Sequence, residues 1–167
     1  VAQILITSST LSSSKVLQKF KFKKTVHQFY PIDNLFLTNK FLRFWKPCLA
    51  IFVDSEIWPN MFNNLHKKNI PLILLNARIT KKSFNRWKIF PNFSKKIFQK
   101  KTLALPQNME SKKYLKLLGT KNIKFTGNLK FFGGEQRDVA KNSTLKKKFS
   151  KKIIFCAAST HRTEELF

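Results

Sequence analysis

The sequence is poor in the residues that disulfide cross-links, metal sites and phosphate loops require. It has two cysteines, Cys48 and Cys156, and four glycines among 167 residues. Two distant cysteines exclude a disulfide framework and a cysteine-based zinc site, so we expect both to be small apolar residues in a reduced compartment. No Gly-rich phosphate loop and no His/Cys/Asp cluster with metal-ligand spacing is present. We therefore predict no metal and no bound cofactor.

Long apolar segments are also missing. A membrane-spanning helix needs about 18 to 20 consecutive apolar residues, and the sequence has no such run and no signal-peptide pattern. Any membrane contact made by these residues is expected to be peripheral. The chain opens at Val1 without a methionine and stops at Phe167 inside a continuing pattern, which we interpret as truncation at both ends.

Acidic residues are scarce. Eight Asp and Glu stand against 33 Lys and Arg, the formal net charge is +25, and all but five of the basic residues are lysine. An excess this large favours a polyanionic partner such as nucleic acid or an anionic lipid surface. Together with 18 phenylalanines and many Asn and Ile, it is also typical of codon drift in an A+T-rich genome. The composition leaves both explanations open.

The sequence does contain a repeated alternation of short apolar runs and helix-like segments. The runs are continuous rather than alternating, which is typical of parallel strands covered on both faces. The strand-helix order predicts an α/β fold with a Rossmann-like parallel sheet. The six predicted strands are residues 4–7, 26–29, 49–53, 72–75, 102–105 and 123–126.

Two of the intervening helices have clear signals. One follows Ser55, which is placed to cap it, and the other has an apolar stripe that includes Leu117 and Leu118 and ends at Gly119. Glycine suits the left-handed conformation that often ends a helix. The first helix is predicted to bury one face on the sheet through Trp58, Met61, Phe62 and Leu65.

The pattern changes after residue 132. Residues 133–152 begin with Gly133-Gly134 and continue as a polar, lysine-rich stretch, which predicts an interdomain linker. A new apolar run over residues 153–157 then predicts another buried strand. We therefore predict a partial N-terminal domain over residues 1–132, a linker over 133–152 and the start of a C-terminal domain over 153–167.

Polar residues follow three of the predicted strands, where ligands collect in an open parallel sheet. Glu56 follows the third strand, Asn76 and Arg78 follow the fourth, and Asn128 and Lys130 follow the sixth. Arg78 and Lys130 could hold a phosphate or carboxylate group. Ordinary surface solvation also explains both cations, and Glu56 could simply favour a helix N-terminus.

Several segments, taken in order, resemble one family of enzymes. The series is similar to the 3-deoxy-D-manno-octulosonic acid (Kdo) transferases, and the similarity covers essentially the whole chain. The segments that carry it are Phe41-Leu42-Arg43-Phe44-Trp45-Lys46-Pro47, Ser55-Glu56-Ile57-Trp58-Pro59-Asn60, Asn76-Ala77-Arg78, Gly127-Asn128-Leu129-Lys130, and Ser159-Thr160-His161 with Glu164-Glu165.

The resemblance implies a GT-B glycosyltransferase, with two Rossmann-like domains that face a cleft. The expected reaction moves Kdo from CMP-Kdo to the lipid A precursor, without a metal, at the cytoplasmic face of the bacterial inner membrane. It also implies that the catalytic general base, a glutamate in a Gly-Glu turn, lies upstream of Val1, so no residue here is predicted to be catalytic. The expected partners are CMP-Kdo, the lipid A precursor and an anionic membrane surface, with no nucleic acid.

The resemblance also places the candidate site residues around this cleft. Glu56, Asn76, Arg78, Asn128 and Lys130 are expected on the N-terminal side. Ser159, Thr160 and His161 are expected on the opposite side, next to Thr163, where the family pattern has a glycine. Another GT-B sugar transferase is the main alternative, and a basic nucleic-acid-binding domain is a further one.

Overall fold

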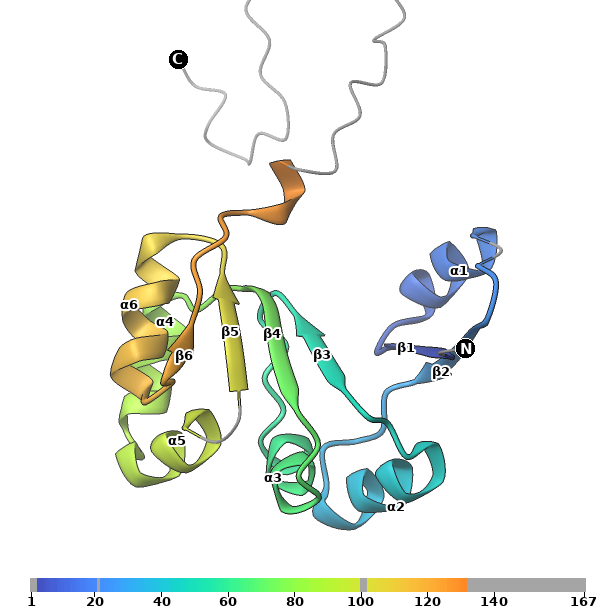
Figure 1. Ribbon diagram of the computed structural model, residues 1–167, viewed down its shortest axis with the longest axis horizontal. Coiled ribbons are helices and arrows are strands. Elements are labelled where there is room, and N and C mark those ends of the chain that lie inside the picture. Colours follow the sequence, from blue (N-terminus) through green and yellow to red (C-terminus); the bar gives the residue numbers. More distant parts are fainter. Residues whose placement is uncertain (1–2, 21, 100–101, 132–167) are drawn as a thin grey trace, which may run out of the picture. The chain divides into compact units, whose positions relative to one another are not determined.

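The computed structural model describes residues 3–20, 22–99 and 102–131 (Figure 1). The chain divides into two units, Val1–Leu129 and Lys130–Phe167, and only Lys130 and Phe131 of the second unit are among the described residues. The predicted linker at 133–152 and the predicted strand at 153–157 lie outside the described residues.

The strands of the described residues form two sheets in which every pairing is parallel. The first sheet pairs β1 (Ile4–Ser8) with β2 (Thr25–Phe29), and the second has the strand order β3-β4-β5-β6. The strands of the second sheet are β3 (Ala50–Val53), β4 (Leu72–Ala77), β5 (Thr102–Pro106) and β6 (Asn122–Ile123). All six predicted strands are present, and the predicted α/β class with a parallel sheet is confirmed.

Six α-helices connect these strands in the described part of the chain. Each connection from one strand to the next contains a helix, as parallel neighbours require. The helices are α1 (Leu11–Lys19), α2 (Leu35–Trp45), α3 (Pro59–Lys67), α4 (Lys81–Lys88), α5 (Pro91–Phe98) and α6 (Met109–Leu118), and a short 3₁₀ turn, η1, covers Leu129–Phe131.

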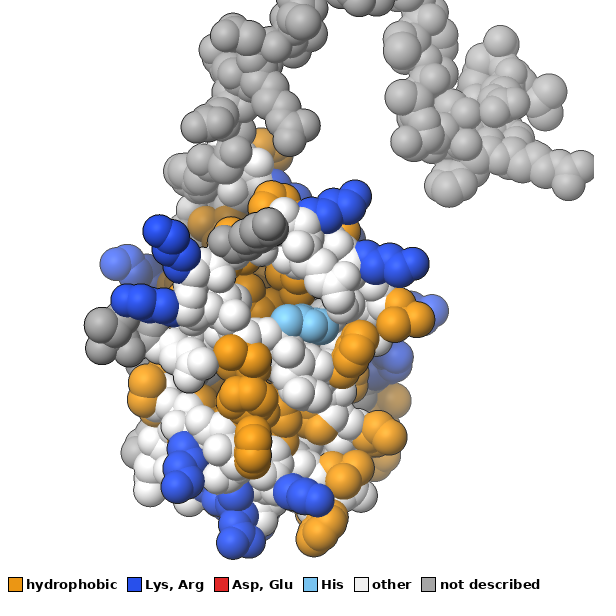
Figure 2. Space-filling view, turned by 90° about the vertical axis from the view of Figure 1, so that its right-hand side faces the viewer, with side chains coloured by type: hydrophobic (Ala, Val, Ile, Leu, Met, Phe, Trp, Pro, Cys, Tyr) orange, Lys and Arg blue, Asp and Glu red, His pale blue; other side chains and the backbone are white. Residues whose placement is uncertain are grey.

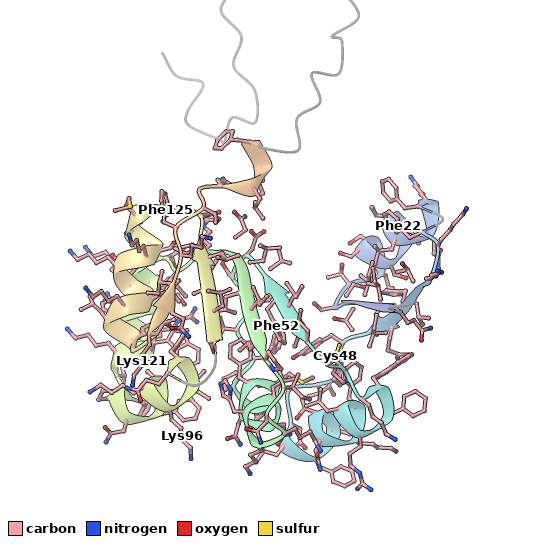
Figure 3. All side chains as sticks on the ribbon, viewed as in Figure 1. Phe22, Cys48, Phe52, Lys96, Lys121 and Phe125 are labelled. Atoms are coloured by element: carbon pink, nitrogen blue, oxygen red, sulfur yellow. The ribbon has the colours of Figure 1, made fainter. Side chains whose placement is uncertain are left out.

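The helix predicted after Ser55 is α3, and it packs against the sheet as expected. Phe62 and Leu65 are almost fully buried, and the ring of Phe62 lies 4.9 Å from that of Phe52. Figure 3 labels Phe52 on β3. Pro59 occupies the first turn, where its missing N–H and fixed φ carry no penalty. At the other end, the helix stops at Lys67, and Asn69 is left-handed (φ 58°) two residues before Pro71.

The structure corrects the sequence prediction in details of α6, β6 and β3. Leu117 was expected in the buried stripe of α6 but is 59% exposed, because Leu115 and Leu118 occupy the buried face. The last strand was expected to reach residue 126, but pairing with β5 stops at Ile123. The third strand was expected to be covered on both faces, whereas Ile51 and Val53 are about half exposed among the described residues.

Candidate functional site

The carboxyl ends of the second sheet bring polar residues together at one edge, toward the top of Figure 1. Asp54 follows β3, Asn76 is part of the end of β4, and Gln107 follows β5. From the sequence we predicted such residues after the third, fourth and sixth strands, and we expected these three strands to be neighbours. The observed order puts β5 between β4 and β6, so Gln107 joins the group.

Asn76 is the centre of this edge. Its side chain is only 3% exposed, and its Nδ2 donates to Asp54 Oδ1 at 2.5 Å and to Gln107 Oε1 at 3.4 Å. Its Oδ1 accepts a hydrogen bond from the backbone N–H of Leu129 at 3.1 Å. One amide side chain therefore connects the chain segments that follow β3, β5 and β6.

The backbone at the ends of β3 and β4 is held by a second group of hydrogen bonds. The N–H of Arg78 donates to the carbonyl of Asp54 at 3.0 Å, and Ser55 Oγ donates to the carbonyl of Arg78 at 3.1 Å. Ser55 was predicted to cap α3, but it pairs with the neighbouring strand end. The side chain of Arg78 is exposed, so its guanidinium is accessible at the edge.

Glu56 is exposed and pairs with its own loop. Its Oε2 accepts a hydrogen bond from Trp58 Nε1 at 2.7 Å, and the Trp58 ring lies 4.9 Å from that of Tyr30. Burial, and then the carboxylates of Asp33 and Glu56, raise the pKa of Tyr30 above its usual range. Its hydroxyl is buried and has no hydrogen-bond partner among the described residues.

Asp33 is a structural carboxylate that the sequence analysis did not assign. Its two carboxylate oxygens accept hydrogen bonds from the backbone N–H groups of Asn60 (3.1 Å) and Met61 (2.9 Å). The N-cap residue of α3, Trp58, supplies no side-chain cap. Asp33, which is 27 positions before Asn60, supplies it instead. Only the tertiary fold brings the two segments together, and no local signal predicts it.

The remaining candidates divide into two groups. Asn128 is half-buried and Lys130 is exposed, and both follow β6 in the segment that Asn76 contacts through Leu129. Ser159, Thr160 and His161 lie outside the described residues. The structure thus brings Asn76, Arg78 and Asn128 to one edge of the sheet, and Glu56 lies in the loop that follows β3.

No group of three or more His, Cys, Asp or Glu within residues 3–20, 22–99 and 102–131 could hold a metal ion. In the same ranges, no helix has the length and apolar character needed to cross a bilayer. Arg78 is an exposed cation at the edge, and the carboxylate of Asp54 is already bound to Asn76. Such a set suits an anionic or hydroxyl-rich ligand better than a cation.

The parallel sheet and its connecting helices define a Rossmann-like α/β domain. The family profile described as "3-Deoxy-D-manno-octulosonic-acid transferase (kdotransferase)" matches residues 1–132. The chain therefore belongs to the Kdo transferase family, and its fold is consistent with the N-terminal domain of a GT-B glycosyltransferase.

Curated relatives carry the same description. The 3-deoxy-D-manno-octulosonic acid transferase of Rickettsia conorii is 38% identical over 98% of this chain and 35% of its own length. The Haemophilus influenzae protein of the same name is 29% identical over 97% and 39%. A probable mitochondrial one from Arabidopsis thaliana is 32% identical over 97% and 38%. The chain thus spans little more than a third of the length of these relatives.

Proposed function

We propose that the protein transfers Kdo from CMP-Kdo to the lipid A precursor in lipopolysaccharide biosynthesis. Membership of the Kdo transferase family supports a glycosyltransferase of this kind. The observation that supports a substrate site is the polar edge of the second sheet. There Asn76 connects the segments that follow three strands, and Arg78 is exposed. Open parallel sheets bind their ligands at this edge.

Arg78 is the residue best placed to bind the substrate. Kdo carries a carboxylate and CMP carries a phosphate, and a guanidinium binds either group through two parallel N–H donors. Its backbone is fixed on both sides, by the carbonyl of Asp54 and the hydroxyl of Ser55. A fixed backbone lowers the entropy lost when the side chain is ordered on binding.

The reaction itself is proposed to be an inverting transfer without a metal. An acceptor sugar hydroxyl loses its proton to a carboxylate and attacks the anomeric carbon of Kdo, and CMP leaves. Glu56 is not our candidate for this base, because its carboxylate already accepts the indole N–H of Trp58. By family resemblance the base is a glutamate of a Gly-Glu turn outside these 167 residues, and we expect the chain alone to be inactive.

The lipid acceptor implies contact with the membrane, at the cytoplasmic face of the inner membrane, and the outer face of α2 is the surface that suits it. Phe36 and Phe44 are 72% and 75% exposed, and Lys40 and Arg43 are exposed between them. The helix contains no acidic residue. Figure 2, which faces the α1, β2 and α2 side, shows hydrophobic and basic side chains intermixed. Such a surface favours anionic lipid headgroups.

The test is transfer of Kdo by the full polypeptide supplied with CMP-Kdo and lipid A precursor. Arg78→Ala is expected to lower kcat/KM about 100-fold, by the roughly 3 kcal/mol that a charge-assisted bond to an anion contributes. Arg86→Ala is the matched control, since Arg86 is an exposed arginine on α4 away from the strand ends. Equal losses in the two variants would remove Arg78 from the site, and no transfer by the wild type would reject the function.

A further inference from the structure

Asn76 has a backbone conformation that turns its side chain across the sheet edge. The register between β4 and β5 shifts between Leu75 and Ala77, so Asn76 is the extra residue of a bulge, and its φ is +52°. Bulges re-aim a side chain at strand ends, and Asn is one of the few residues that enter the left-handed region readily. The bulge at the end of β4 therefore directs the amide of Asn76 toward the ends of the neighbouring strands.

The partners of Asn76 require an amide. Its nitrogen faces two acceptors, Asp54 Oδ1 and Gln107 Oε1, and its oxygen faces one donor, the N–H of Leu129. Both ends of the side chain are used, and the whole group is buried. A carboxylate at this position would face the carboxylate of Asp54 with no proton between them. A buried amide with these bonds satisfied has little left with which to hold a substrate.

We propose that Asn76 is a positioning residue that holds the segment from Gly127 to Leu129, and thereby Asn128, in place at the substrate edge. The amide binds the backbone N–H of Leu129, the residue next to Asn128, across 53 positions of sequence. Gly127 has a left-handed φ of +79°, so the segment turns sharply just before this anchor. This inference rests on the proposed function, because it assigns the segment to the transfer site.

Exchanging the two partners gives a specific test. Asn76→Asp keeps an oxygen that accepts the N–H of Leu129, but it loses the N–H that donates to Asp54. It also places two carboxylates, at positions 54 and 76, next to each other. Asp54→Asn alone keeps an acceptor for Asn76. The double variant Asp54→Asn/Asn76→Asp restores one donor and one acceptor with unchanged net charge and shape. Positions 54 and 76 both have left-handed φ values, a conformation that both Asn and Asp adopt more often than most residues.

In the full polypeptide, Asn76→Asp is expected to lower kcat/KM for CMP-Kdo at least about tenfold, the effect of one lost buried hydrogen bond. The Asp54→Asn variant is expected to stay within about threefold of the wild type, and the double variant to recover most of the loss. Hydrogen exchange of the backbone amides of residues 127–131 is expected to accelerate in Asn76→Asp and to slow again in the double variant.

Asn64→Asp is the control for a general loss of stability. Asn64 is also buried, but its amide donates to Thr38 Oγ1 and to the carbonyl of Leu35, both at 2.8 Å, away from the edge. It should destabilise the protein without accelerating exchange at 127–131. A double variant that fails to recover, or exchange at 127–131 that responds equally to both single Asn→Asp changes, would overturn the positioning role. Absence of transfer by the wild type would reject the proposed function alone, because the exchange experiment needs no activity.

Discussion

Replacing Asp33 tests whether a distant carboxylate caps α3. In the structure this side chain accepts the N–H groups of Asn60 and Met61, at 3.1 and 2.9 Å, and Met61 is 2% exposed. In Asp33→Ala both N–H groups lose their acceptor, and the one at Met61 is poorly placed to find water. The helix that carries Phe62 and Leu65 into the core then begins with unsatisfied donors.

The expected loss follows from the ordinary energetics of capping. Removing an N-cap acceptor costs about 0.5 to 2 kcal/mol, and a negative charge at a helix N-terminus contributes about 0.3 to 1 kcal/mol. Because one donor is buried, we expect a value near the upper end, about 2 kcal/mol. Asp33→Asn keeps one oxygen acceptor and loses the charge, so we expect about 1 kcal/mol for it.

The assay is equilibrium urea unfolding of the chain, followed by circular dichroism. With a denaturant dependence of about 2 kcal/mol per molar urea, a loss of 2 kcal/mol lowers the midpoint by about 1 M. Glu110→Gln is the matched control, because it raises the net positive charge of the chain by the same amount as Asp33→Asn. Glu110 is exposed, and its carboxylate accepts a hydrogen bond from the hydroxyl of Tyr114.

The outcome separates two effects of removing an acid from a strongly basic chain. Glu110 lies in the first turn of α6, so Glu110→Gln also removes an acid from a helix N-terminus. If Asp33→Asn lowers the urea midpoint no more than Glu110→Gln does, the two hydrogen bonds of Asp33 add nothing to the effect of lost charge and the capping argument fails. If Asp33→Ala has no effect beyond about 0.5 kcal/mol, the N–H groups of α3 have another acceptor and the inferred role of Asp33 is refuted.

Two further predictions concern stability. Gly119→Ala should lower the free energy of unfolding, measured in urea, by about 1 to 2 kcal/mol. Gly119 has φ +106°, which is unfavourable for L-residues, and an added Cβ would lie 3.1 Å from Gln99 Cγ. An unchanged urea midpoint would contradict this prediction. Tyr30→Phe should be nearly neutral at pH 7, because the phenol has no partner to lose. The raised pKa of Tyr30 means that the folded state keeps its proton after the unfolded state loses it, so wild-type stability falls above pH 10 by up to about 1.4 kcal/mol per pH unit. The Phe variant should lack this alkaline loss, and a parallel decline in both proteins would exclude Tyr30 as its source.

Local signals predicted the elements of this fold well. Continuous apolar runs marked all six strands, and Gly119 marked the end of α6, because these signals act within a few residues. The errors arose where packing decided the outcome. Whether Leu115 or Leu117 faces the core depends on how α6 is rotated about its axis against β5. That rotation is set by packing and cannot be predicted from any single residue.

The candidate site shows the same division. Arg78, Asn76 and Asn128 could be predicted because each follows an apolar run. Gln107 also follows an apolar run, so the same rule, that polar residues directly after a strand lie at the edge of the sheet, could have predicted it. The capping role of Asp33 and the contact of Asn76 with Leu129 span 27 and 53 residues, so they depend on strand order, which the sequence pattern did not provide.

The open edge of β3 has a consequence for handling this chain. Among the described residues, β3 pairs only with β4, and its four residues, Ala50 to Val53, include no lysine, proline or bulge that would block a further strand. Ile51 and Val53 are about half exposed beside this edge. Unpaired backbone groups flanked by apolar side chains recruit strands from other molecules. Self-association at high protein concentration should therefore begin at β3, in spite of the repulsion that a charge of +25 provides.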